Sequence, residues 1–141
     1  MRRTQNIRIS WGAYIMAVID QAKRVMVVDF RENIRKILSL ILKRNGFQVI
    51  ETVNGKEALE KLDESKIDIL ITHLNLPHMN GIELVKNLRS RSDFKSTPVI
   101  MVSSDNHESR KRKAKQLGVN EWILTPLIPS LLMVIVRRLI A

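Results

Sequence analysis

Residues 71–89 of the chain read ITHLNLPHMNGIELVKNLR, and this stretch decides the fold. It begins inside an apolar run over 67–73, which predicts a buried strand. The loop LNLPHMN follows, and Gly81 then opens a segment over 81–90 whose apolar residues recur at helical spacing. A strand, a loop and a helix in this order form one strand–helix unit of an α/β protein.

The same alternation continues on both sides of this unit from Lys23 onward. We expect strands over 24–29, 47–51, 67–73, 98–103 and 121–124. We expect helices over 32–45, 81–90, 107–117 and 129–140. A further helix would begin after Asn54, which can cap it. Strict alternation predicts a doubly wound, five-stranded parallel sheet covered on both faces. Sites in such sheets lie beyond the carboxyl ends of the strands, here at Asp29, Phe30, His73, Ser103, Ser104 and Thr125.

The length of 141 residues fits one domain, which we place at residues 23–141. Residues 1–22 stand outside the pattern as an N-terminal extension, and Met16 would itself be a plausible start of the protein. The extension would add a short helix or strand whose apolar face, which includes Ile7, Ile9, Trp11, Ile15 and Ile19, packs on a neighbour. Its apolar stretch is too short and too polar to span a bilayer, so we expect a cytoplasmic protein.

Composition limits the chemistry further. The 45% of hydrophobic and 27% of charged residues are ordinary for a globular protein. The chain has no cysteine, which excludes disulfides, thiol catalysis and cysteine-ligated metal sites. The net charge of +10 favours contact with acidic proteins, nucleic acid or anionic membranes, without choosing among them.

The ordered motifs resemble the response-regulator receiver family over nearly the whole chain, from residue 23 to residue 141. Residues 71–89 are similar to the family's strand-three motif, whose loop ends Met-Pro-x-Met-x-Gly; Leu76, Pro77, Met79 and Gly81 match that ending. Supporting matches are VVD at 27–29, NGKEALEKL at 54–62, TPVIMVSS at 97–104 and GVNEWILTPL at 118–127. The resemblance implies a flavodoxin-like, CheY-like sheet with the strand order 2-1-3-4-5.

The resemblance also implies a site in which this chain departs at three positions. The family uses a strand-three aspartate as phosphoacceptor, two acidic residues after strand one for Mg²⁺, and a strand-five lysine for the phosphoryl group. Here His73 stands at the acceptor position, Phe30 at the second acidic position and Thr125 at the lysine position. The positions that still match are Asp29, the metal-carbonyl position Asn75, the hydroxyl position Ser103 and the aromatic switch position Trp122.

These changes predict a degenerate phosphoacceptor site without an Mg²⁺ cofactor, because too few anionic ligands remain. We interpret His73 as an imidazole that fills the vacated pocket and bonds to Asp29. A pH-sensing group, a phosphohistidine and a metal ligand are the alternatives for this residue. Asp29 would cap the first helix or hold His73, and Phe30 would pack over the site.

Two helices suggest surfaces for partners. The helix over 107–117 carries Arg110, Lys111, Arg112 and Lys113, which form either a basic docking patch or an ordinary solvated face. The helix over 129–140 is apolar beyond a single stripe. Its surplus suggests contact with a partner helix, from a second copy of the protein or from the N-terminal extension.

Our leading hypothesis is a stand-alone pseudo-receiver that is not an enzyme. It would bind a histidine kinase or another two-component protein, and its last helix would also allow a homodimer. It would act in a state that phosphate does not set. Three alternatives stay open. The domain would accept phosphate at an unusual residue, or use Asp29, His73 and Ser103 as a hydrolase triad, although no G-x-S-x-G elbow exists. Nucleic-acid association through charge is the third, without a recognition module to support it.

Overall fold

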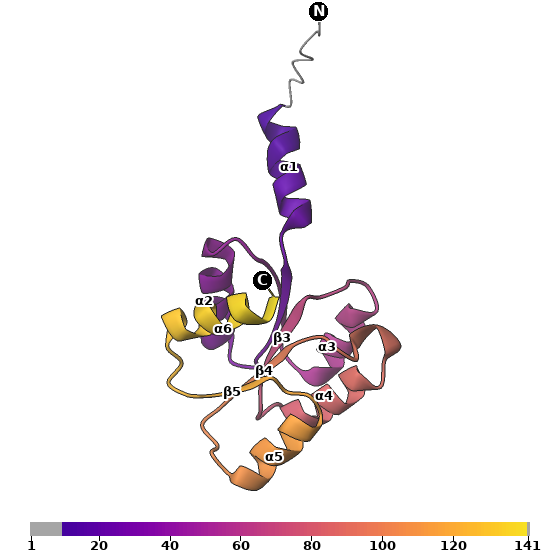
Figure 1. The fold of residues 1–141 in the computed structure, drawn as a ribbon, viewed down its shortest axis with the longest axis vertical. Coiled ribbons are helices and arrows are strands. Elements are labelled where there is room, and N and C mark those ends of the chain that lie inside the picture. Colours follow the sequence, from indigo (N-terminus) through magenta and orange to yellow (C-terminus); the bar gives the residue numbers. More distant parts are fainter. Residues whose placement is uncertain (1–9, 141) are drawn as a thin grey trace, which may run out of the picture.

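A parallel sheet of five strands forms the centre of the molecule (Figure 1). The computed structural model describes residues 10–140, except for the side chains of 18–20. The strand order is β2-β1-β3-β4-β5, which confirms the expected topology. The strands are β1 (Arg24–Val28), β2 (Gln48–Thr52), β3 (Ile69–His73), β4 (Val99–Ser103) and β5 (Glu121–Leu124).

Helices connect the strands and cover both faces of the sheet (Figure 1). The helices are α1 (Trp11–Gln21), α2 (Glu32–Arg44), α3 (Gly55–Leu62), α4 (Gly81–Arg89), α5 (Glu108–Gln116) and α6 (Pro129–Ile140), with a short 3-10 helix η1 (Ser92–Phe94). Helices α3, α4 and α5 pack on one face, and α2 and α6 pack on the other. The expected bounds differ from these by at most two residues at an end.

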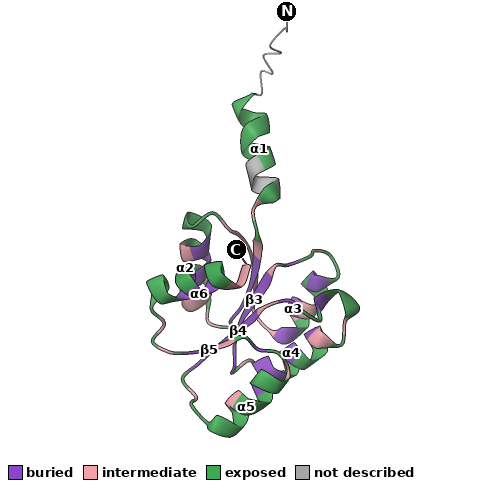
Figure 2. Cartoon of the chain, viewed as in Figure 1, coloured by how far each residue is buried: buried purple, intermediate pink, exposed green. Residues whose placement is uncertain are grey.

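The continuous apolar runs of the strands follow from this double cover. In β1, Val25 and Val27 belong to the core under α2 and α6, whereas Met26 and Val28 belong to the core under α3, α4 and α5. All four are buried, and the strands at the centre of Figure 2 are drawn mostly as buried. A strand with one solvated face would alternate apolar and polar residues, and β1 has no such face.

Asparagine caps and glycine stops set where the helices begin and end. The side chain of Asn54 accepts a hydrogen bond from Glu57 N at 2.8 Å, which confirms the expected cap of α3. Asn80 caps α4 in the same way through Glu83 N. Gly46 follows α2 with φ of +90°, a conformation that glycine adopts without steric cost.

The N-terminal extension forms a helix, α1, that projects from the amino end of β1 away from the sheet (Figure 1). Trp11 and Ile15 are exposed on it, so residues 10–140 do not cover this part of the apolar face, and α1 is drawn mostly as exposed in Figure 2. Ile7, Ile9 and the side chain of Ile19 lie outside the described residues. No helix in the described part of the chain is long and apolar enough to cross a bilayer.

Candidate functional site at the carboxyl edge of the sheet

The strand register brings the candidate residues to one edge of the sheet. Val28 pairs with Thr72, and His73 pairs with Val102, so Asp29, His73 and Ser103 end three neighbouring strands. Thr125 follows β5 beside them, and its N–H donates to Ser103 O at 3.0 Å. Asp29, His73 and Ser103 are 2%, 8% and 0% exposed, so the edge has a buried polar floor.

Gly81 allows the loop after β3 to return to that edge. Its N–H donates to Leu74 O at 2.7 Å, and a Cβ at this position would lie 2.6 Å from His73 O and 2.8 Å from Met101 Sδ. Both approaches are shorter than any van der Waals contact. The glycine of the strand-three motif is therefore required by the packing of α4 against the end of β3.

His73 bonds to its own loop. The Nδ1 atom lies 3.1 Å from both Asn75 N and Asn75 O. Both contacts hold the ring against the loop after β3. The interpretation that His73 bonds to Asp29 is wrong, because the ring turns toward residue 75 instead.

Asp29 is occupied by a guanidinium. Its Oδ1 accepts from Arg31 N at 2.9 Å and from Arg31 Nε at 3.1 Å, and its Oδ2 accepts from Arg31 Nη2 at 2.9 Å. This hydrogen bonding to Asp29 raises the pKa of Arg31. Arg31 occupies the N-cap position of α2 without a side-chain cap bond, and the Asp29 carboxylate accepts from the Arg31 N–H instead of holding His73. Sequence reasoning missed Arg31, although its place two residues after Asp29 allows this contact.

A second arginine secures the same corner. Arg35 Nη1 donates to Asp29 O at 2.9 Å, and Arg35 Nε lies 3.4 Å from Glu51 Oε1 on β2. Phe30 lies between Asp29 and Arg31 in the sequence, and 51% of it is exposed. Its packing over the site stays a prediction.

The loop after β4 contains a charged cluster that sequence reasoning also missed. Asp105 Oδ1 accepts from His107 N at 2.8 Å and lies 2.6 Å from His107 Nδ1, and Arg110 pairs with Oδ2. The backbone N–H of His107 is the first cause that lowers the pKa of Asp105 to about 2, followed by the His107 ring and Arg110. The only sequence signal was a carboxylate close after the strand end.

Two further contacts tie this loop to the edge and to β5. Asp105 N donates to Ser103 Oγ at 2.9 Å, and Trp122 Nε1 donates to Asp105 O at 3.0 Å. Ser103, His73 and Asp29 thus each bond to the loop after their own strand. In residues 10–140 no hydrogen bond joins the three side chains, so the relay that an acyl-transfer triad requires is not assembled.

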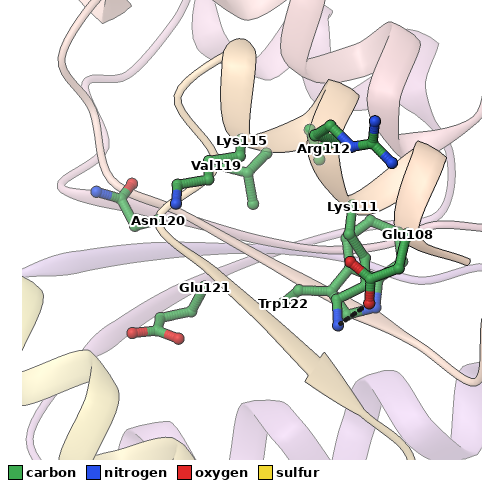
Figure 3. A pocket seen from close by; sticks show the side chains of 9 residues that line it. Glu108, Lys111, Arg112, Lys115, Val119, Asn120, Glu121 and Trp122 are labelled. Carbon is green, nitrogen blue, oxygen red and sulfur yellow. Dashed lines mark ion pairs between the residues drawn. The ribbon is translucent and has the colours of Figure 1, made fainter. Parts of the chain in front are cut away.

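Helix α5 presents its basic residues beside Trp122. A pocket of about 400 Å³ lies between α5 and β5, and Figure 3 shows Trp122 close to Glu108 and Lys111, with Arg112 on the same helix. Lys111 Nζ lies 3.8 Å from Glu108 Oε1, and Arg110 is held by Asp105. Two of the four predicted docking residues, Arg110 and Lys111, are therefore paired with carboxylates of the same region. Arg112 and Lys113 are exposed and have no ion-pair partner in the described part of the chain.

Metal ligands are sparse at this edge. In the described residues, no three histidine, aspartate or glutamate side chains lie close enough together to hold a metal ion. Asp29 is the one carboxylate on the buried floor, and its oxygens accept from Arg31.

Comparisons with known proteins agree with this geometry. The family model of the response regulator receiver domain matches residues 25–137. Chemotaxis protein CheY1 of Helicobacter pylori is 40% identical over 111 residues, which cover 77% of this chain and 90% of the relative. The chemotaxis protein CheY homolog of Campylobacter jejuni is 35% identical over 111 residues, which cover 77% of this chain and 85% of the relative.

The solved structures lead to the same family. Chemotaxis response regulator CheY4 of Vibrio cholerae matches with a TM-score of 0.80 at 31% identity, over 84% of this chain and 99% of that one. The receiver-domain model matches most of the chain, and the relatives named above are more than 30% identical to it. Both findings agree with the five-stranded parallel sheet. The chain therefore belongs to the response regulator receiver domain family, with the CheY-like fold of two-component signalling proteins.

Proposed function

We propose that this protein is an atypical receiver that acts by binding other proteins and is not phosphorylated on aspartate. Receiver domains interact with kinases and other signalling proteins, and this chain keeps the receiver fold. In the proposal it has no catalytic role of its own, and it meets its partner in the cytoplasm. Its binding state is set by contacts within the chain.

The contact between Arg31 and Asp29 carries the proposal. The guanidinium takes both oxygens of the one carboxylate on the buried floor. Mg²⁺ binds oxygen ligands in octahedral geometry and sheds its waters reluctantly, so it needs several anionic donors. One carboxylate already paired with a cation does not fit that requirement, and we infer that the site holds no resident Mg²⁺.

The phosphoacceptor chemistry lacks other parts as well. His73 replaces the carboxylate that would attack phosphorus, and its Nδ1 is bonded to Asn75. Thr125 has no charge to pair with a transferred phosphoryl group, as a lysine would. Ser103 Oγ accepts from Asp105 N, which leaves its O–H as a donor, so the hydroxyl is a part of the site that remains.

The same loop supports a fixed docking face. Trp122 Nε1 bonds to Asp105 O, while Asp105 N bonds to Ser103, so β5 and the start of α5 are joined without any ligand. Arg112 and Lys113 then face solvent on α5. Their free charges fit an acidic protein surface, and binding of this kind weakens as salt screens the charges.

Incubation with acetyl phosphate and Mg²⁺, read by intact mass, tests the phosphorylation claim. We expect no added phosphoryl group on the native protein. A variant with Phe30→Asp, Arg31→Ala, His73→Asp and Thr125→Lys is the positive control, and we expect it to gain one. A gain on the native protein that His73→Ala abolishes would replace the proposal with a phosphohistidine receiver. A gain that His73→Ala leaves intact would point to another acceptor and equally overturn it.

Fluorescence anisotropy with a labelled polyglutamate peptide tests the docking claim. Arg112→Ala with Lys113→Ala should weaken binding severalfold, because these charges are free to pair. Lys56→Ala with Lys61→Ala removes the same charge from exposed positions on α3 and should change binding little. Equal losses of peptide affinity in both variants would show that α5 is an ordinary solvated basic face. Tighter binding to a labelled DNA duplex, lost steeply as salt rises, would favour nucleic acid as the partner.

A further inference from the structure

Helix α1 is apolar from Trp11 to Ala17, and these residues stay exposed in the described part of the chain. Its sequence, WGAYIMAVIDQ, contains no lysine or arginine in a chain with 24 of them. Trp11 is 79% exposed, Tyr14 53%, Ile15 51% and Met16 58%. The rings of Trp11 and Tyr14 meet edge to face with centroids 5.9 Å apart. A helix that is hydrophobic on all sides is normally buried, so α1 requires a covering surface.

A matching apolar surface lies at the far end of the domain. A groove of about 280 Å³ opens between α2 and the segment after β5, where Ile34, Ile37, Ile41 and Leu127 line it. This volume is at the lower limit for a small-molecule site, and it suits one or two inserted side chains. The groove is apolar except for Arg31 and Thr125 at its rim.

Further apolar residues are exposed on α2 and α6. On α2, Ile37 is 54% and Leu40 49% exposed; on α6, Leu131 is 47% and Val134 62% exposed, and both helices cover the same face of the sheet. This confirms that α6 carries more apolar surface than its sheet-facing side needs. Patches of this kind mark contact sites on soluble proteins.

Geometry argues against closure within one chain. Only Ala22 and Lys23 separate α1 from β1, and α1 leaves the sheet at the amino end of β1 (Figure 1). The groove lies at the opposite, carboxyl edge, beside Thr125 and Pro126. A membrane surface is also disfavoured, because helices that lie in the interface carry a charged face, which the described side chains of α1 lack.

We propose that α1 of one copy packs into the groove between α2 and the segment after β5 of a second copy. The second copy would place its own α1 in the same way, which gives a two-fold dimer. Buried tryptophan and tyrosine side chains each cover about 150–250 Å². Two exchanged helices with the grooves that receive them would bury on the order of 1,200–2,000 Å², the size of a stable interface. Basic surfaces would not meet there, because α1 carries no basic residue.

Sedimentation velocity over a range of concentrations tests the dimer. The native protein should show a monomer–dimer equilibrium, and Trp11→Glu with Tyr14→Glu should raise the dissociation constant by about tenfold or more. Ile37→Glu should do the same from the other side of the contact. Both sites are exposed in the single copy, so the variants should fold. Lys36→Glu, next to Ile37 and exposed, is the control and should dimerise normally.

Cross-linking identifies the contact, because the chain has no native cysteine. Copies with Tyr14→Cys are mixed under oxidising conditions with copies that carry Ile37→Cys. Disulfides between the two kinds of copy support the exchange. A native protein that stays monomeric at high concentration, or a dimer that survives both Trp11→Glu with Tyr14→Glu and Ile37→Glu, would overturn the proposal. So would a monomer whose α1 binds vesicles containing anionic lipid.

Discussion

The guanidinium of Arg31 meets the carboxylate of Asp29 side by side, with Nε 3.1 Å from Oδ1 and Nη2 2.9 Å from Oδ2. Paired hydrogen bonds of this kind are among the strongest that side chains make. Arg31 lies two residues from its partner along the chain, so this cation is tethered and cannot diffuse away. The corner between β1 and α2 therefore has its own counter-ion at any concentration of divalent metal.

Restoring the family residues should reveal that tethered cation. The triple change Phe30→Asp, His73→Asp and Thr125→Lys returns the missing carboxylates and the lysine. We expect it to bind Mg²⁺ weakly by calorimetry, because Arg31 still neutralises Asp29. Adding Arg31→Ala should tighten Mg²⁺ binding by about tenfold or more, since a nearby like charge opposes a cation. Equal Mg²⁺ affinity in the triple and quadruple variants would show that Arg31 does not compete with the metal.

The bond from Trp122 to Asp105 should hold the loop after β4. Trp122→Phe keeps an aromatic ring but removes the donor, leaving Asp105 O without its indole N–H. We expect a loss of about 0.5–1.5 kcal/mol in the free energy of unfolding and faster hydrogen exchange over residues 104–107. Trp11→Phe is the matched control, because Trp11 is 79% exposed. Unchanged exchange in Trp122→Phe would mean that the bond does not restrain the loop.

Gly81 should not tolerate a side chain. Gly81→Ala places a Cβ 2.6 Å from His73 O, so α4 or the end of β3 has to move. We expect a loss of about 1–3 kcal/mol in the free energy of unfolding in urea, the usual cost of overpacking. Gly12→Ala on α1 is the comparison, because a Cβ there meets nothing within 4 Å. A Gly81→Ala protein as stable as the native one would show that the loop after β3 adjusts freely.

Alternation of apolar runs and helical segments was sufficient to predict a five-stranded parallel sheet, and the resemblance to the receiver family supplied its strand order. The register then placed Asp29, His73 and Ser103 on neighbouring strand ends. What they bond to was not predictable, because that depends on rotamers and on the path of each loop. His73 turns to Asn75, and Asp29 turns to Arg31. In each case a partner two residues away in the same chain prevails over one on the next strand.

Exposure of apolar residues in loops was equally hidden from the sequence. Phe30, which is expected to pack over the site, follows β1 and is 51% exposed. The basic helix is predicted to be either a docking patch or a solvated face, and neither prediction includes the pairing of Arg110 with Asp105. Asp105 itself belongs to no strand or helix pattern, so no periodicity marks it. Local loop geometry decided all three outcomes.

Asp105 should make the stability of the fold depend on acid pH. Its pKa in the folded protein is lowered from the ordinary value of an aspartate to about 2, chiefly by the His107 backbone N–H. A lowered folded-state pKa means that the contribution is complete above the unfolded value and is lost as the pH falls through about 2. Between about pH 5 and pH 2 the unfolded state thus binds more protons, and native stability falls with the pH.

Asp105→Asn removes this titration while keeping an oxygen that can accept from His107 N. In urea unfolding at successive pH values, the native protein should therefore lose stability more steeply than Asp105→Asn between about pH 5 and pH 2. Asp93→Asn, an exposed aspartate of η1, serves as the control and should follow the native curve. Parallel curves for the native protein and Asp105→Asn would mean that the contacts with His107 and Arg110 form equally in the unfolded chain. The contacts with Ser103 and Trp122 would then be the ones that hold the loop in the folded protein.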